Sequence, residues 1–239
     1  DVLVAGAFEY QALLPAVTAA FTASMTSHFL GLEKFSFALT AEMNLNLPDM
    51  GKLILAGILF GIVGGAFAWA LKYIKAKLAR IWSQPVIRIF YMGLIISMLL
   101  LLLYQGRYAG LGTNLIHISF YGGEIYSFDW ILKFMLTIMT LTAGFQGGEV
   151  TPLFAIGASL GAVAGPVMGI PPELAAALGY ASVFGSASNT FLAPVLIGAE
   201  VFGFAYFPHF FIVCAFAYLF NLNKSIYSLQ KIWGGTHTI

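Results

Sequence analysis

Charged residues are scarce in this sequence of 239 residues. Asp, Glu, Lys and Arg together make up 9%, whereas hydrophobic residues make up 60% and the mean hydropathy is +0.89. Soluble domains usually carry about 25% charged residues, so this composition excludes an ordinary soluble domain and indicates an integral membrane protein. The formal net charge of +1 also argues against a nucleic-acid partner.

Cysteine is almost absent, and histidine is sparse. The single cysteine, Cys214, lies in an apolar run and cannot form an internal disulfide, so we interpret it as a small buried hydrophobic residue. The four histidines are scattered without metal-ligand spacing, and the sequence contains no nucleophile and base pair and no nucleotide-binding loop. The sequence therefore predicts no metal site, no cofactor and no enzymatic activity, which leaves a transporter or a channel.

Three apolar runs are long enough to cross a bilayer. They lie at residues 13–32, 53–74 and 86–104, and each approaches the roughly 20 residues that a membrane-spanning helix needs. Later apolar runs are mostly shorter, so we expect broken, tilted or re-entrant helices in an all-α integral membrane protein. The shorter runs are 130–145, 153–168, 174–184, 191–206 and 207–220, with breaks predicted at 165–166, 169–172, 185–189 and Pro208.

The clearest cluster of positive charge lies between the second and third long apolar runs. It consists of Lys72, Lys75, Lys77, Arg80 and Arg88. Because cytoplasmic loops of membrane proteins carry an excess of Lys and Arg, the sequence predicts that the 72–88 connection is cytoplasmic. A solvated amphipathic connector would show the same pattern, and the two interpretations are compatible.

A glycine-rich break lies within the later apolar region. The run 144–161 contains five glycines, one carboxylate and one proline in otherwise apolar sequence. Non-helical backbone is tolerated at membrane depth only where protein buries it or a cavity wets it, so a break at Gly147 and Gly148 predicts an ion site. Pro152 suits the first turn of the helix that follows, because its missing N–H would be unpaired there anyway. The free amides of that turn would attract an anion.

Glycines also recur every four residues in the helix that this break precedes. Gly157, Gly161 and Gly165 would lie on one face of it. Such spacing lets two helices approach closely, so we predict a packing role for these residues rather than contact with an ion.

The segment GGEVTPLFAIGASLG, residues 147–161, resembles the GGxFxP segment of the CLC family of chloride channels and transporters. Its GEVTP sequence is most similar to the fluoride-transporting branch of that family. Three further segments resemble the family in order and spacing, and the last of them resembles a final helix whose pore tyrosine corresponds to Tyr227. These segments are GLGTNLI at 110–116, SASNTFLAPVLIGAEVFG at 186–203 and NKSIYSLQ at 223–230.

The resemblance implies a CLC-like inverted-repeat fold with broken and re-entrant helices. This chain would supply the second repeat and the end of the first, and residues 1–239 would form a single transmembrane domain, the C-terminal half of a CLC-type subunit. A missing N-terminal half would carry the gating glutamate. Because Asp1 follows no methionine and the sequence ends soon after Tyr227, we expect a start within a longer protein and no cytoplasmic regulatory domain. The expected assembly is a homodimer in a prokaryotic inner membrane.

The resemblance also implies site residues, one position at a time. The backbone amides of Glu149 and Val150, directly after Gly148, match amides that face the central anion in the family. The Tyr227 hydroxyl matches a donor to the same anion. Thr151 replaces a small apolar residue of the chloride branch, and its hydroxyl suits fluoride, whose strong hydration must be replaced by good donors. These five residues are the predicted anion-binding residues.

Glu149 departs most from the chloride pattern, in which an apolar side chain normally stands. A nearby anion and burial in a low dielectric both favour its protonated form, so alternation between its two forms would couple proton movement to anion movement. A carboxylate at this position can instead cap its own helix. For Asn189 and Thr190 the sequence also leaves two roles open, which are lining the pore and capping the next helix.

Two functions remain open from the sequence. The first is fluoride export by fluoride/proton antiport, which the GEVTP segment favours. The second is passive or chloride-selective transport by a CLC anion channel or transporter. The expected partners are fluoride or chloride, the lipid bilayer and, for the antiporter, protons.

Overall fold

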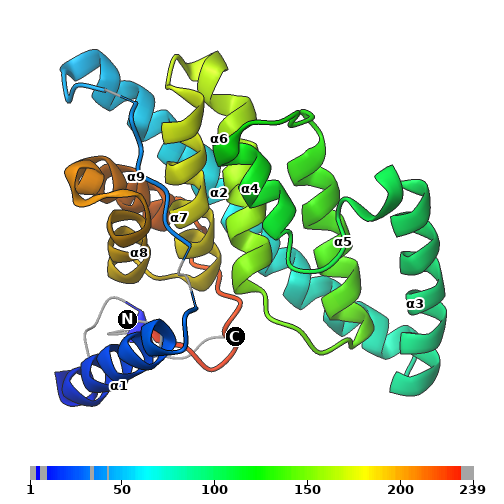
Figure 1. Cartoon of the computed structure of the whole chain (residues 1–239). Helices are drawn as coiled ribbons and strands as arrows, with labels where there is room; N and C mark the ends of the chain where they lie inside the picture. The colour runs from blue at the N-terminus through cyan, green and yellow to red at the C-terminus, as the bar shows by residue number, and fades with distance from the viewer. Residues whose placement is uncertain (1–3, 6–9, 33–34, 42, 233–239) are drawn as a thin grey trace.

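Figure 1 shows the chain as a computed structural model that describes residues 4–5, 10–32, 35–41 and 43–232. The regular secondary structure of the described part is almost entirely helical, which confirms the all-α fold class. Its strand pair, β1 (Val4–Ala5) and β2 (Lys231–Ile232), is parallel and very short. Asp1 and residues 233–239 lie outside the described part. The helices are α1 (Tyr10–Phe29), α2 (Leu47–Ile81), α3 (Pro85–Leu102), α4 (Thr113–Tyr121), α5 (Asp129–Ala143), α6 (Val150–Met168), α7 (Pro172–Ser188), α8 (Leu192–Phe202) and α9 (Phe207–Leu219), with 3-10 turns η1 (Tyr104–Gly106) and η2 (Phe204–Tyr206).

Helix α2 is the long central element behind the bundle in Figure 1. Its start is fixed by Asn46, whose side chain accepts a hydrogen bond from the N–H of Asp49 at 2.9 Å. The helix has 35 residues and is therefore about 50 Å long, more than the roughly 30 Å of a hydrocarbon core. Its buried residues end at Leu71, so the lysine-bearing turns that follow lie outside the packed bundle.

Three of the described helices are long and apolar enough to cross a membrane, namely α2, α3 and α6. The spans predicted at 53–74 and 86–104 are thereby confirmed. The run predicted at 13–32 forms helix α1, but α1 is not among the three, because serine and threonine side chains interrupt its apolar surface. The side chains of α1 are mostly exposed, and the helix lies at the edge of the bundle in Figure 1.

Helices α6 and α7 pack with their backbones in direct contact. A Cβ on Gly157 would meet the carbonyl oxygen of Gly179, and a Cβ on Gly161 would meet that of Ala175. The packing role predicted from the glycine spacing is therefore confirmed. Helix α7 is buried along nearly its whole length between α6, α2 and α9, so the α6 and α7 pair forms the centre of the fold.

The breaks predicted at 165–166 and Pro208 are absent, whereas those at 169–172 and 185–189 are present. Helix α6 continues through Pro166 to Met168, although Pro166 lacks the N–H that would bond to the carbonyl oxygen of Ala162, and Gly169 then ends the helix with φ of 67°. Helix α7 continues to Ser188 and ends at Asn189. Pro208 lies in the first turn of α9 rather than in a break.

The segment after α9 is not helical. Residues 221–230 form turns and irregular backbone, whereas the resemblance predicted a helix at 223–230. The N–H of Ile226 donates to the carbonyl oxygen of Ala187 at 2.8 Å, so the segment bonds to the end of α7 instead of forming its own helical bonds. Tyr227 consequently lies on a turn segment beside α7.

Candidate functional site

The break predicted between two apolar helices lies at residues 144–149. Helix α5 ends at Ala143, Gly144 adopts a left-handed conformation with φ of 109°, and α6 starts at Val150. The segment is exposed at Gly148, where an added Cβ would meet no atom within 4 Å. The start of α6 therefore lies at an accessible surface.

The first turn of α6 supplies backbone donors that the helix itself does not use. The N–H of Leu153 donates to the carbonyl oxygen of Glu149 at 3.0 Å and closes the turn, while Pro152 has no N–H. The amides of Val150 and Thr151 precede this bond, and amides in that position have no acceptor within an α-helix. The helix dipole adds partial positive charge at the same place. This turn can therefore bind an anion.

Glu149 occupies the N-cap position of α6, but its side chain makes no capping hydrogen bond. Any benefit of this carboxylate to the helix is therefore purely electrostatic. Helices α6 and α7 are antiparallel, with Gly157 against Gly179 and Gly161 against Ala175, so the end of α7, to which the Tyr227 segment is bonded, lies beside the start of α6. The fold thus places Glu149 and the Tyr227 segment at the same end of the α6 and α7 pair.

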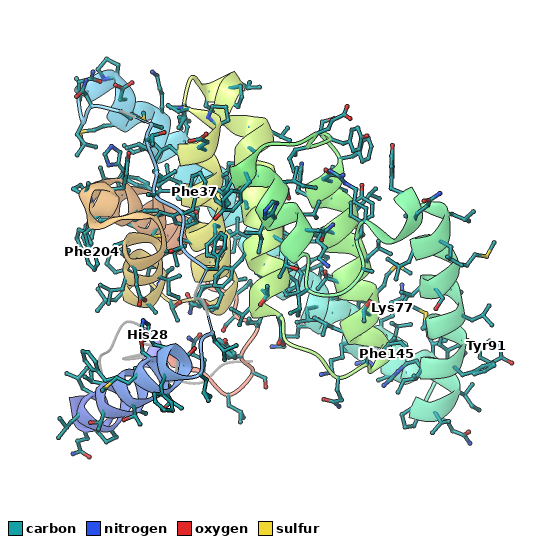
Figure 2. All side chains as sticks on the ribbon, viewed as in Figure 1. His28, Phe37, Lys77, Tyr91, Phe145 and Phe204 are labelled. Carbon is teal, nitrogen blue, oxygen red and sulfur yellow. The ribbon has the colours of Figure 1, made fainter. Side chains whose placement is uncertain are left out.

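Arg88 of α3 holds the end of α5 at the start of the break. Its Nε donates to the carbonyl oxygen of Ala143 at 2.9 Å, and its Nη2 would lie 3.3 Å from a Cβ on Gly144. A cation at a helix C-terminus satisfies a carbonyl group and interacts favourably with the helix dipole. Phe145, labelled in Figure 2, lies next to α3, where its ring would contact a Cβ on Gly93. The charge pattern alone had placed Arg88 only in the positive connection.

Asn189 and Thr190 are buried between α7 and α8. Asn189 is the C-cap of α7 with φ of 54°, and α8 starts further along the chain, so the expectation that these residues cap the next helix is wrong. The hydroxyl oxygens of Thr190 and Ser188 lie 2.7 Å apart. The side-chain amide of Asn189 bonds to Asn221 at 2.6 Å and to Gln230 at 3.3 Å.

A second buried polar cluster lies at the start of α5. Asp129 accepts hydrogen bonds from Nη2 of Arg107 at 2.7 Å and from the hydroxyl of Tyr108 at 2.6 Å. Lys133, one turn later, donates to the carbonyl oxygens of Tyr108 at 3.0 Å and Gly110 at 2.7 Å. Sequence analysis missed this cluster. The sequence did contain a signal for it, because Asp129 and Lys133 are charged residues four positions apart in an apolar helix.

The broken helix, the apolar spans and the exposed amides are typical of membrane channels and transporters. The chain belongs to the CLC family, since residues 2–222 match the family described as voltage gated chloride channel. It is 33% identical to a chloride/fluoride channel protein of Pseudomonas syringae pv. tomato, over 99% of this chain and 54% of that protein.

Further comparisons agree with this family. The chain is 23% identical to the voltage-gated ClC-type chloride channel ClcB of Salmonella typhimurium, over 80% of this chain and 47% of that protein. A crystal structure of a CLC-type fluoride/proton antiporter superimposes with a TM-score of 0.95 and 56% identity, over 97% of this chain and 58% of that chain. This chain has a CLC fold and spans about half the length of the relatives that it matches.

Proposed function

We propose that this chain forms the anion-binding half of a fluoride/proton antiporter that exports fluoride. The observation that carries the proposal is the accessible first turn of α6, which lies at the same end of the antiparallel α6 and α7 pair as the segment that bears Tyr227. The similarity to a solved CLC-type fluoride/proton antiporter at 56% identity supports the same function.

The proposed anion site is built from hydrogen-bond donors. Fluoride is small and strongly hydrated, so a binding site must replace its water with good donors. The amides of Glu149, Val150 and Thr151 and the hydroxyls of Thr151 and Tyr227 would provide them. Gly148 has no side chain, and the space beside it is open, so an anion can approach the backbone there.

Glu149 is the proposed proton-coupling residue. When its carboxylate is charged, it repels an anion at the first turn of α6. When protonated, the same group becomes a donor and can hold fluoride. A proton that Glu149 takes up from outside would therefore favour fluoride binding from inside, and release of that proton to the inside would favour departure of fluoride to the outside. This alternation would couple proton movement to anion movement.

The remaining half of the protein would complete the site. In inverted-repeat transporters the binding site lies between the two repeats, and the relatives that this chain matches are about twice as long. We propose that the other half supplies the gating glutamate and covers the exposed break, and that the protein works as a homodimer. The positive 72–88 connection would face the cytoplasm of a prokaryotic inner membrane. Asn189 and Thr190 would line the pore only where the other half approaches them.

A passive or chloride-selective CLC channel is the second candidate. It is favoured by the 23% identity to the chloride channel ClcB. Such a protein needs no proton-coupled carboxylate. The two candidates therefore differ in the role of Glu149.

Anion efflux from proteoliposomes containing the full-length protein tests the proposal. Fluoride efflux is compared with chloride efflux while external pH is recorded, for the wild type and Glu149→Gln. We expect fluoride-selective efflux with opposing proton movement in the wild type and loss of proton coupling in the variant. Equal efflux of the two anions without proton movement would establish the passive candidate.

The matched control is Glu173→Gln. Glu173 lies in the first turn of α7, beyond the far end of α6, and the length of α6 separates it from the proposed site by about 28 Å. This variant makes the same chemical change, so proton coupling should be unchanged. If it abolished coupling as well, the effect would not belong to the anion site.

A further inference from the structure

Tyr227 lies on a segment that has no helix or strand to fix it. Residues 221–230 are turns and irregular backbone. The neighbours of Tyr227 bond to the last turn of α7 instead. The N–H of Ile226 donates to a carbonyl oxygen there at 2.8 Å, and the hydroxyl of Ser225 donates to the carbonyl oxygen of Ser188 at 3.2 Å. The N–H of Tyr227 donates to the Ser225 hydroxyl at 3.1 Å.

Three side-chain amides complete this attachment, and we refer to Asn189, Asn221 and Gln230 as the amide cluster. Nδ2 of Asn221 donates to Oδ1 of Asn189 at 2.6 Å, and Nδ2 of Asn189 donates to Oε1 of Gln230 at 3.3 Å. Nε2 of Gln230 donates to the carbonyl oxygen of Ser188 at 3.1 Å. Bonds to the end of α7 therefore hold the chain on both sides of Tyr227.

The amide cluster is costly to disrupt. Asn189 and Asn221 are 3% and 2% exposed. Leaving a buried amide without a hydrogen-bond partner destabilises the folded protein. The carbonyl groups at the end of α7 lack partners within the helix, and the Tyr227 segment supplies them. Asn189 also adopts a positive φ of 54°, a conformation that asparagine tolerates better than most residues.

The attachment to α7 fixes Tyr227 relative to the proposed anion site. Helix α7 packs against α6 with backbone contacts at Gly157 and Gly161, so the two helices are held closely together. These contacts pair Gly157 with Gly179 and Gly161 with Ala175, so the helices are antiparallel and the end of α7 lies beside the start of α6, where Glu149 is. A segment anchored to the end of α7 therefore places the Tyr227 hydroxyl at a defined position near the first turn of α6.

We propose that the amide cluster is a positioning device that sets the Tyr227 hydroxyl for anion binding, with Gln230 acting through Tyr227. This inference rests on the proposed function, because it assumes that the Tyr227 hydroxyl contacts the transported anion. Gln230 would not touch the anion itself. Its role would be to keep the turn segment, and with it the hydroxyl, in place.

A double-mutant cycle in the full-length protein tests the positioning role. Gln230→Met keeps the length of the side chain and removes its hydrogen bonds, and Tyr227→Phe removes the hydroxyl. We expect Gln230→Met to lower anion affinity and transport rate by about fivefold to tenfold in the wild-type background. In the Tyr227→Phe background the same change should alter both by less than about twofold, because the hydroxyl is already gone.

Affinity for fluoride is measured by calorimetry on the purified protein, and transport rate is measured by efflux from proteoliposomes. If Tyr227→Phe abolishes flux, the affinities alone complete the cycle. Equal effects of Gln230→Met in both backgrounds, or no effect in either, would overturn the proposal. If Gln230→Met does not fold, Gln230→Glu replaces it, since it retains the acceptor for Asn189 and loses the donors to the end of α7. Gln105→Met, at an exposed position outside the cluster, is the control and should behave as the wild type.

The cycle separates failure of this inference from failure of the proposed function. If the wild type carries chloride without proton movement, the antiport proposal fails, and the same cycle is then measured with chloride. Coupling between Gln230 and Tyr227 for whichever anion is carried supports the positioning role. Independent effects of the two substitutions contradict it for either anion.

Discussion

Arg107 and Asp129 form an ion pair in which Nη2 lies 2.7 Å from Oδ2, and the side chain of Asp129 is completely buried. The carboxylate accepts further hydrogen bonds from the hydroxyl of Tyr108 and from the N–H of Tyr126. A buried charge with this many partners is satisfied, but removing it leaves its partner unpaired. The pair therefore ties the connection before α4 to the start of α5.

We expect Asp129→Asn to lower the free energy of unfolding by about 3 kcal/mol, because the Arg107 guanidinium would lose its counter-charge. Chemical denaturation of the detergent-solubilised protein measures the change. Glu124→Gln is the matched control, since Glu124 is exposed and its substitution should change stability by no more than about 0.5 kcal/mol. Similar losses for the two variants would show that the burial of Asp129 is not the cause.

The pH dependence of this ion pair has a defined sign. The hydrogen bond to Asp129 is the main cause that raises the pKa of Arg107 above its usual range, with partial burial acting in the opposite direction. A raised pKa in the folded state gives stability that is present below the unfolded value and is lost only as the pH rises through the folded value. The stability difference between wild type and Asp129→Asn should therefore stay constant from about pH 7 to pH 10. A decline over that range would contradict this assignment.

Gly161→Ala should destabilise the protein by about 2 kcal/mol, because the new methyl group would meet the backbone of α7 at Ala175. Thermal unfolding in detergent measures the effect. The control is Gly51→Ala, since Gly51 lies in a helix and an added Cβ there meets no atom within 4 Å. That substitution should be neutral or slightly stabilising. Equal losses of stability at the two glycines would mean that the effect of Gly161→Ala does not come from the close approach of α6 and α7.

The helix break and the packing of α6 were predictable because both depend on local chemistry. The glycines at the break and Pro152 mark a helix start, and the spacing of Gly157 and Gly161 marks a close helix contact; both features are present. The break predicted at Pro166 was wrong, because the packing of α6 against α7, which is close at Gly165, outweighs the one hydrogen bond that the proline removes.

The burial of Lys133 and the conformation around Tyr227 were not predictable in the same way. Lys133 donates to backbone carbonyl groups of Tyr108 and Gly110. Because every residue has a backbone carbonyl group, the sequence does not identify which of them accept these hydrogen bonds. The predicted final helix is replaced by turns because the end of α7 offers carbonyl groups to Ile226 and Gln230. Such contacts depend on the tertiary fold and not on local propensity.

Thr151→Val should reduce selectivity for fluoride over chloride on the order of tenfold, because it keeps the side-chain shape and removes one donor to a charged acceptor. Efflux of the two anions from proteoliposomes measures the ratio. Thr140→Val is the matched control, since the Thr140 hydroxyl donates within α5 to the carbonyl oxygen of Leu136. An unchanged anion ratio in Thr151→Val would remove the Thr151 hydroxyl from the proposed site.

Arg88→Met should loosen the end of α5 and slow anion transport by a few-fold. The substitution preserves the length of the side chain but removes the hydrogen bond from Nε to the carbonyl oxygen of Ala143, which costs about 1 kcal/mol. The free carbonyl lies at the start of the break that leads to Glu149, so greater motion there would misplace the first turn of α6. Unfolding and fluoride efflux are measured together on the full-length protein.

The control for Arg88 separates capping from long-range charge. Lys75 belongs to the same positive connection and is exposed, so Lys75→Met removes an equal charge without removing a contact to α5. If the hydrogen bond to Ala143 matters, only Arg88→Met lowers stability and flux, and high salt does not abolish the difference. If the positive field alone attracts anions, both substitutions slow flux equally and the effect disappears at high salt, because the charges of an exposed cluster are screened. The second outcome would leave Arg88 without a role at the helix break.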